Sequence, residues 1–363
     1  MAWMRWWLPS PGSRDAAPPA GEPAFGIGRN LALTPGSVVF RNERFELIQY
    51  AAATPRVGRR PLLVVPPRTH KYYLLDLTPE TSLVRWIVAQ GHTVFVVSWR
   101  GARPGPDDGR DGDACVDDGV VAAIRVAKEI SGSATVNTAG YASGGTLLVC
   151  ALAMLAARRE RSVASATLLA TRLDFADRCA AEDSPAADVP AASALAHWQA
   201  DAAAVPESFS AWWEASFERG NRLRQPGALS LAGVPLDLRR ITVPTYVFAA
   251  RDDRVVPWRA AYRSTELLGG DVTFVLGSSG HVDGVVHPPA ATDGRHWTND
   301  LVTAAADAWQ ARAVAQSGSW WPHWAAWLAP YAGAARTAPA SLGSNTHPPL
   351  GAAPGGYVLG VDG

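Results

Sequence analysis

The chain has 363 residues, of which 48% are hydrophobic and 18% are charged, so it can bury a large core and is not a disordered protein. Its 33 Lys and Arg residues balance its 33 Asp and Glu residues. Because binding to nucleic-acid phosphates needs surplus cations, this balance argues against a general nucleic-acid binder. The length suits a single α/β domain with an insertion.

The cysteines and the apolar runs predict the cellular compartment in which the protein is located. Cys115, Cys150 and Cys179 have neither paired nor metal-like spacing, which is typical of a reducing environment. The longest apolar run, residues 146–157, is shorter than the roughly 20 residues that a membrane-spanning helix needs. Prolines interrupt the aromatic start of the chain, so no signal peptide is predicted. We therefore expect a cytoplasmic protein without a membrane span.

After an arm rich in Pro, Ala and Gly over residues 1–30, short apolar runs alternate with amphipathic segments. Apolar runs rich in β-branched residues predict strands buried on both faces. The predicted strands are 37–40, 45–51, 61–67, 92–99, 134–139, 166–170, 243–250 and 272–276. The predicted helices are 81–90, 117–130, 144–158 and 260–268. Strands separated by helices of this length imply a mostly parallel sheet with helices on both faces.

One stretch interrupts this alternation. Residues 176–225 begin with an Ala-, Asp- and Pro-rich segment that has few large apolar side chains, which indicates a reduced cap or insertion over the sheet edge. The α/β core is thus expected in two parts, residues 31–175 and 226–332. Residues 333–363 are again rich in Pro, Gly and Ala and are expected to form an extended tail.

The segment Gly140-Tyr141-Ala142-Ser143-Gly144 has the form of a nucleophile elbow, in which the central residue occupies a strained turn between a strand and a helix. Glycines flank such a turn because neighbouring backbones approach closely there. The nucleophile position is Ala142, whose methyl group cannot attack a carbonyl. The nearest hydroxyl is Ser143. One residue of slip on a helix rotates a side chain by about 100°, so we expect this hydroxyl to miss the general base.

Two further residues have the chain order of a catalytic triad. Asp253 and His281 each follow a predicted strand, at the sheet edge where such folds place their sites. The imidazole would act as general base and the carboxylate would orient it. An oxyanion hole would use the backbone N–H of Ser143 and a second N–H from the loop after residues 61–67. Prolines end that strand and have no N–H, so Arg68 is the candidate, with Thr69 as the alternative.

Each of these residues has a structural alternative. An Asp after a strand often caps a helix or a turn, and a single Gly-His pair is often structural, so the two support a site only together with the elbow. His92, His287 and His296 lack metal-ligand spacing and are predicted to be structural. Cys150 lies in an apolar helix and is expected to be a packed thiol. No metal or cofactor is therefore expected.

Long segments around these motifs resemble polyhydroxyalkanoate synthases of the class that acts without a second type of subunit. The segments are GRNLA, PLLVVPP, KYYLLDLTPETSLVRWIVAQGHTVFVVSW, TLLATRLDFAD, VPTYVFAARDDRVVPW, VLGSSGHVDGVVHPP and GSWWPHWAAWL. The resemblance implies an α/β-hydrolase fold with a Cys–His–Asp triad that polymerises (R)-3-hydroxyacyl-CoA and releases CoA. It implies that His281 is the base, that Asp253 orients it, and that the cysteine position of the family falls on Ala142.

Compared with that family, the chain has alanine at the cysteine position, and we expect a shorter cap and only the arm before Gly28 in place of the long amino-terminal domain. The leading hypothesis is a synthase-like protein impaired as a synthase, which acts as a partner or modulator in polyester metabolism. Its expected partners are acyl-CoA, the polyester granule surface, a second copy of the chain or an active synthase. Granule association is expected with the cytoplasmic location.

In two alternative hypotheses the protein is an active enzyme. In one, Ser143 attacks an ester or thioester with His281 and Asp253, which gives an active acyltransferase or hydrolase. In the other, His281 and Asp253 activate water against a bound thioester. The tryptophan-rich segment GSWWPHWAAWL either binds a polymer or synthase surface or packs in the core.

Overall fold

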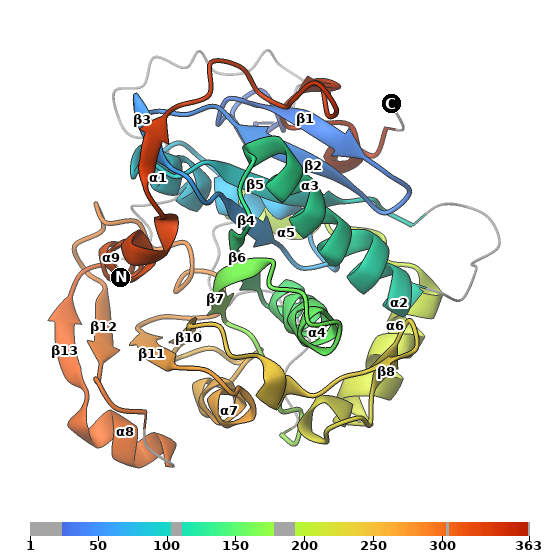
Figure 1. Cartoon of the computed structure of the whole chain (residues 1–363). Coiled ribbons are helices and arrows are strands. Elements are labelled where there is room, and N and C mark those ends of the chain that lie inside the picture. The colour runs from blue at the N-terminus through green and yellow to red at the C-terminus, as the bar shows by residue number, and fades with distance from the viewer. Residues whose placement is uncertain (1–23, 103–110, 178–192, 303–304, 362–363) are drawn as a thin grey trace.

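The computed structural model describes residues 24–102, 111–177, 193–302 and 305–361 (Figure 1). Most of the expected arm and the first part of the expected insertion lie outside the described residues. The centre is a sheet with strand order β13-β12-β11-β10-β7-β6-β4-β5-β2-β1-β15. Its strands are β1 (Gly36–Arg41), β2 (Phe45–Tyr50), β4 (Leu62–Val65), β5 (Val94–Trp99), β6 (Val136–Tyr141), β7 (Val163–Leu169), β10 (Thr245–Ala250), β11 (Val272–Gly277), β12 (Arg295–Thr298), β13 (Val314–Ser317) and β15 (Gly351–Ala352).

Six neighbouring strands pair in parallel, as the alternation of apolar runs and helices predicts: β5, β4, β6, β7, β10 and β11. β4, β5 and β6 are buried along their whole length; β4 and β5 are almost entirely apolar in sequence, whereas β6 includes the buried polar residues Asn137 and Thr138. β2, β1 and β15 on one side and β12 and β13 on the other pair antiparallel. The sheet is therefore mostly parallel, as expected.

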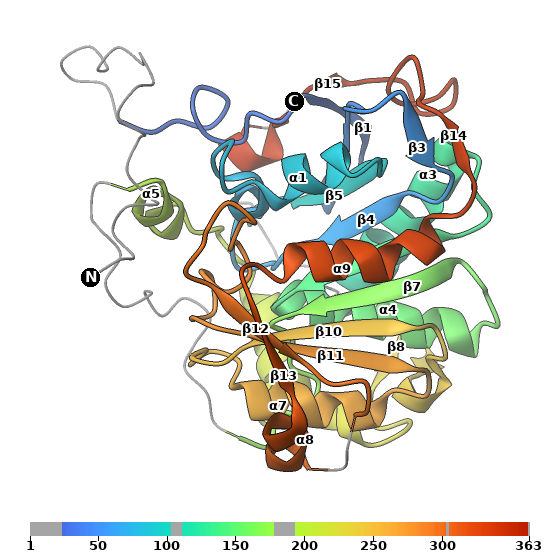
Figure 2. The ribbon, with the colours of Figure 1, turned by 90° about the vertical axis from the view of Figure 1, so that its left-hand side faces the viewer.

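Helices cover both faces of the sheet. They are α1 (Leu83–Ala89), α2 (Asp111–Ala114), α3 (Ala122–Ser131), α4 (Ser143–Ala157), α5 (Ala194–Ala200), α6 (Glu207–Trp213), α7 (Trp258–Ser264), α8 (Ala306–Arg312) and α9 (Trp321–Leu328). One face packs against α3, α4, α6 and α7, and the other packs against α1, α5 and α9. Figure 2 shows α1 and α9 across the second face, where the rings of Trp86 and Trp321 lie 5.5 Å apart.

The tryptophan-rich segment belongs to the core. Trp320, Trp321 and Trp324 are at most 2% exposed and pack with the strands of the second face. Their indole N–H groups donate to Gly284 O, Val285 O and the Thr167 hydroxyl, respectively. Buried aromatic rings with satisfied N–H groups explain this segment as packing, and these three rings are not available to a polymer surface.

The structure contains elements that were not predicted, among them β12, β13, α8 and α9, and it differs from the predicted elements at two further places. The helix expected at 117–130 begins earlier, because α2 continues through a π-helical stretch (Cys115–Val121) into α3. The expected tail is extended but ordered: β14 (Ala335–Thr337) pairs with β3 (Arg56–Gly58), and β15 pairs with β1. Backbone pairing to distant strands leaves no local pattern, so the sequence does not reveal it. No helix in the described ranges is long and apolar enough to cross a membrane.

Candidate active site

The turn between β6 and α4 has the backbone of a nucleophile elbow. Ala142 has φ 49° and ψ −124°, a conformation that is rare for a residue with a side chain. Dense packing holds the turn. A methyl group on Gly140 would lie 2.4 Å from the Gly145 Cα, and one on Gly144 would lie 2.3 Å from the Pro66 carbonyl oxygen. The strained residue of the turn is therefore Ala142, and Ser143 is the first residue of the helix that follows.

Asp253 and His281, which lie after β10 and β11, come together as the sequence predicts. The His281 Nδ1 lies 2.7 Å from Asp253 Oδ2. The other carboxylate oxygen, Oδ1, accepts hydrogen bonds of 2.8 Å from the backbone N–H groups of Val255 and Val256. With both oxygens engaged, the Asp253 side chain is fully buried and fixed, whereas the His281 side chain is 12% exposed. Because Nδ1 faces the carboxylate, Nδ1 carries the ring proton and donates it in a hydrogen bond to Asp253. Nε2 is then the ring nitrogen that can accept a proton.

Tyr141, the residue before the elbow, contacts His281 from the strand side. The two rings stack with centroids 5.3 Å apart, and the Tyr141 hydroxyl donates to the His281 carbonyl oxygen at 3.5 Å. The imidazole is thus held by Asp253 at Nδ1 and by an aromatic ring on one face. Tyr141 was not predicted to be a site residue, although its place in the elbow motif was a signal.

The predicted oxyanion groups lie on either side of the elbow. The Ser143 N–H is at the N-terminus of α4, a 15-residue helix whose dipole favours negative charge at that end. Arg68 follows β4, and the carbonyl groups of Val65, the last residue of β4, and of Pro66 lie against Gly144. Their use as an oxyanion hole remains a prediction.

The side chain of Arg68, rather than its backbone, is the unexpected feature of this loop. Arg68 is 4% exposed, and its Nε and Nη1 have no hydrogen-bond partner among the described residues. Its guanidinium lies 5.9 Å from the ring centroids of Trp99 and of Phe209 in α6. Aromatic faces compensate for only part of the cost of burying a charge. A single Arg after a strand carries no sequence signal of burial, so this charge was not predicted.

The part of the expected insertion that the structure describes closes over the loop after β4. The Lys71 ammonium lies 2.5 Å from Asp201 Oδ1, and the Tyr73 hydroxyl donates to Asp201 Oδ2 at 2.9 Å. The Trp198 indole N–H donates to the Lys71 carbonyl, and its ring stacks on His70 at 4.9 Å. Short helices α5 and α6 therefore cover the residues next to the elbow.

The other candidate nucleophiles and ligands are structural in the described chain. Cys150 is fully buried in α4, and burial raises the pKa of its thiol to about 12, which makes it unreactive. Cys115 is also buried, and Cys179 lies outside the described residues. Burial lowers the pKa of His92 to about 4 and also lowers the pKa values of His287 and His296. Within the described ranges, no three His, Cys, Asp or Glu side chains gather as a metal site.

Three features define an α/β-hydrolase fold. They are the sheet order, the elbow after the central strand β6, and the positions of Asp253 and His281 after the parallel strands β10 and β11. Among solved structures, a 2-hydroxy-6-oxo-6-phenylhexa-2,4-dienoate hydrolase from a Rhodococcus species is similar. It has 13% identity and a TM-score of 0.45, covering 68% of this chain and 91% of the other.

Sequence comparisons place the chain more narrowly. Residues 14–87 match the family model of the poly-beta-hydroxybutyrate polymerase (PhaC) N-terminus. The chain is 42% identical to the poly(3-hydroxyalkanoate) polymerase subunit PhaC of Cupriavidus necator, over 93% of this chain and 66% of that protein. It is 34% identical to poly(3-hydroxyalkanoate) polymerase 2 of Ectopseudomonas oleovorans, over 93% of this chain and 68% of that protein.

The chain therefore belongs to the poly(3-hydroxyalkanoate) polymerase family, which confirms the resemblance that its motifs indicate. It spans about two thirds of the length of these two relatives, 66% and 68% respectively.

Replacing the buried Arg68 by methionine should stabilise the protein in the absence of ligands. Removing an unpaired buried charge while keeping an apolar side chain of similar length should raise the free energy of unfolding by about 1–3 kcal/mol. Urea denaturation at neutral pH measures this change. The control is Arg219→Met, because Arg219 is 68% exposed and pairs with Glu214, so its loss should change stability by less than about 0.5 kcal/mol. A large loss of stability in Arg68→Met would show that the charge is compensated.

Proposed function

We propose that this chain is a poly(3-hydroxyalkanoate) polymerase-like protein that is impaired as a polymerase and acts as a partner or modulator in polyester metabolism. One observation carries the proposal: the elbow residue, with φ 49° and ψ −124°, is an alanine. The elbow presents a methyl group where the family resemblance implies a cysteine. The base and its carboxylate remain beside the elbow, 2.7 Å from each other.

The missing atom removes a bond-forming step. In the reaction implied for the family, a cysteine thiolate attacks the thioester carbonyl, a carbon–sulfur bond forms, and the CoA thiolate leaves. The Ala142 methyl has no lone pair, so no acyl-enzyme can form on it. In a triad of this kind, loss of the nucleophile lowers kcat by roughly 10⁶-fold. His281 then has no thiol to deprotonate.

The lengths of the alignments support a reduced cap. The alignment with the Cupriavidus necator polymerase covers 390 positions, more than the 363 residues of this chain, so that relative carries segments that this chain lacks. The insertion between β7 and β10 is the place that the family resemblance indicates for such a loss. A smaller cap would alter how an acyl-CoA reaches the elbow, which adds to the effect of the missing thiol.

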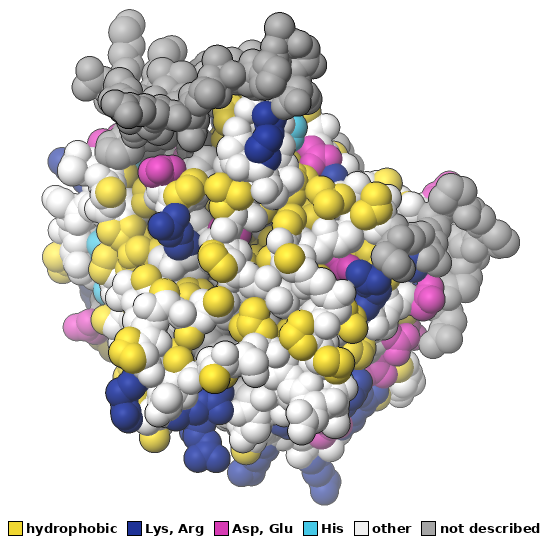
Figure 3. Space-filling view, turned by 90° about the horizontal axis from the view of Figure 1, so that it is seen from above, with side chains coloured by type: hydrophobic (Ala, Val, Ile, Leu, Met, Phe, Trp, Pro, Cys, Tyr) yellow, Lys and Arg dark blue, Asp and Glu magenta, His cyan; other side chains and the backbone are white. Residues whose placement is uncertain are grey.

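The surface beside β1 supports contact with a polyester granule. Leu350, Leu359 and Val361, on the C-terminal tail, are between 50% and 54% exposed, and Leu33 before β1 is 42% exposed. Figure 3 views the molecule from the side of β1 and the tail, and hydrophobic side chains are spread across that face. Exposed apolar side chains such as these can contact an apolar partner surface. A polyester surface has the matching apolar chemistry.

Restoring the nucleophile tests the leading proposal. The wild-type protein should release no CoA from (R)-3-hydroxybutyryl-CoA above background, and Ala142→Cys should release it, because only the attacking sulfur is absent from the triad. Chromatographic quantification of free CoA measures both. The control is Ala142→Cys combined with His281→Ala, which should lower the gained rate by at least about 10²-fold because the thiol loses its base. Turnover by the wild type at rates of roughly 1 s⁻¹ or more would contradict the proposal.

The intact contact between Asp253 and His281 favours one second function, hydrolysis of a bound ester or thioester. Water activated by His281, or Ser143 acting as a nucleophile, would serve. A chromogenic short-chain acyl ester separates the two. If water attacks, His281→Ala should abolish turnover and Ser143→Ala should leave it within about twofold. If Ser143 attacks, both variants should lose activity by about 10³-fold or more. No turnover in any variant excludes hydrolysis of this ester.

Granule contact is tested by sedimentation with purified poly(3-hydroxybutyrate) granules. The wild-type protein should co-sediment, and the triple variant Leu350→Ser, Leu359→Ser, Val361→Ser should bind about tenfold less, because it loses three exposed apolar side chains. The matched control is Leu301→Ser with Val314→Ser, whose side chains are 69% and 65% exposed elsewhere on the surface. Equal binding by both variants would reject this face as the contact.

A further inference from the structure

A cavity of about 680 Å³, widely open to solvent, lies at the end of α4 that is remote from the elbow. Its walls come from the last turns of α4, the start of β7 and the segment that leads into β10. The elbow residue immediately precedes α4, and a 15-residue helix is about 22 Å long, so the cavity is separate from the candidate active site. Its volume is within the range of small-molecule sites.

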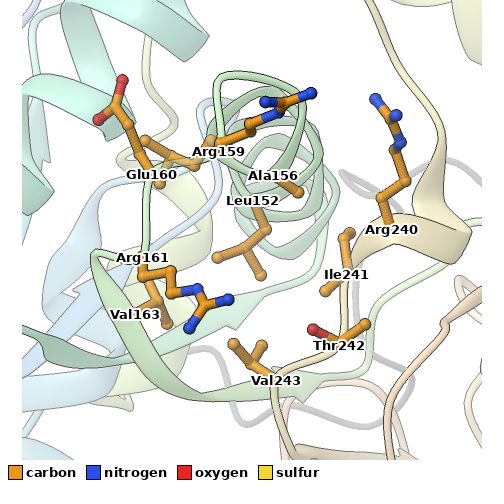
Figure 4. A pocket seen from close by; sticks show the side chains of 11 residues that line it. Leu152, Ala156, Arg159, Glu160, Arg161, Val163, Arg240, Ile241, Thr242 and Val243 are labelled. Atoms are coloured by element: carbon orange, nitrogen blue, oxygen red, sulfur yellow. The ribbon is translucent and has the colours of Figure 1, made fainter.

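Three arginines surround this cavity: Arg159, Arg161 and Arg240. In Figure 4 the Arg161 side chain extends across the opening above Val243, and the Arg159 and Arg240 side chains rise at the far rim. Within the described part of the chain, none of the three arginines makes an ion pair or a side-chain hydrogen bond. Three like charges around one cavity repel one another unless an anion lies between them.

The acidic groups near these arginines do not neutralise the cavity. Glu160 lines it, but its carboxylate points away from Arg161 and Arg240 in Figure 4. Asp237 attracts Arg240 electrostatically, but it forms its bidentate ion pair with Arg239, at 2.9 and 3.0 Å, and so is shared between two cations. The rim therefore keeps a surplus of positive charge.

The floor of the cavity is lined by aliphatic side chains from α4, β7 and the segment before β10: Leu152, Leu155, Ala156, Val163, Ile241 and Val243. Four of them, Leu152, Leu155, Val163 and Ile241, are between 2% and 9% exposed, so the floor is a narrow apolar strip. Figure 4 shows the Leu152 and Val243 side chains directed into the space between the arginines and the strands. An apolar floor with a cationic rim matches a ligand that has an alkyl body and an anionic head group.

We infer that this cavity binds a single-tailed amphiphilic anion, with the alkyl chain on the aliphatic floor and a carboxylate or phosphate held by Arg161 and Arg240. Guanidinium groups bind both kinds of head group through paired hydrogen bonds, so the shared chemistry is an oxyanion on an alkyl chain. The site does not depend on the proposed loss of polymerase activity, because it shares no residue with the elbow or with the Asp253–His281 pair.

Isothermal titration of the full-length protein with sodium decanoate, below its micelle concentration, tests the inference. Wild-type protein should bind one decanoate per chain. Arg161→Gln with Arg240→Gln should weaken binding by about tenfold or more, because the head group loses charge-assisted hydrogen bonds. Decyl phosphate in a parallel titration assigns the preferred head group. Decyl maltoside, which has the same tail without charge, should bind at least about tenfold more weakly than decanoate.

Two further variants distinguish the cavity from a general charge effect. Ala156→Phe fills the floor and keeps every arginine, so it should also weaken decanoate binding by about tenfold. Arg219→Gln with Arg259→Gln removes the same number of exposed charges elsewhere and should leave the affinity within about twofold. Equal weakening by both arginine pairs, unchanged binding in Ala156→Phe, or binding only to phosphatidylglycerol vesicles and not to decanoate would each overturn the inference. Circular dichroism confirms that each variant is folded.

Discussion

Three backbone segments approach one another closely at the elbow: the end of β6, the start of α4 and the end of β4 with Pro66. Their packing fixes the geometry of the turn. Gly140, Gly144 and Gly145 have no room for a side chain, because the helix, the end of β4 and Thr171 occupy that space. This packing forces the single residue between strand and helix into a left-handed conformation. The turn is thus determined by its glycines and not by the residue that it presents. An alanine can occupy the position of a nucleophile without any change in the fold around it.

The Asp253–His281 pair can persist for a reason unrelated to catalysis. Asp253 accepts two backbone N–H groups of the turn that precedes α7, so its carboxylate shapes that turn as well as orienting the imidazole. His281 in turn fills the space between Asp253 and the Tyr141 ring. Removing either residue would leave buried polar groups or a gap. Chemistry on a substrate and the stability of two loops therefore favour the same residues.

The parts of this structure that the sequence predicts are those with a local signal. The buried strands β4 and β5 are almost continuous apolar runs, and the elbow is a short motif, so these strands and the elbow were found in place. Asp253 and His281 were found because strand ends and chain order locate them together. The burial of Arg68 was not predictable, since it arises from Trp99 and Phe209, which are distant in sequence. The pairing of the tail with β1 and β3 likewise depends on tertiary contacts.

The last strand of the tail has a protective consequence. β15 hydrogen-bonds to the outer edge of β1, and the backbone N–H of Leu350 donates to the Val38 carbonyl. Without this cover, β1 would offer further unpaired N–H and C=O groups along a strand that carries Val38, Val39 and Phe40, a template for another chain to extend the sheet. A few residues more than 300 positions after β1 thus act as a guard against self-association. A protein shortened at its carboxyl end would keep its candidate active site and lose this guard.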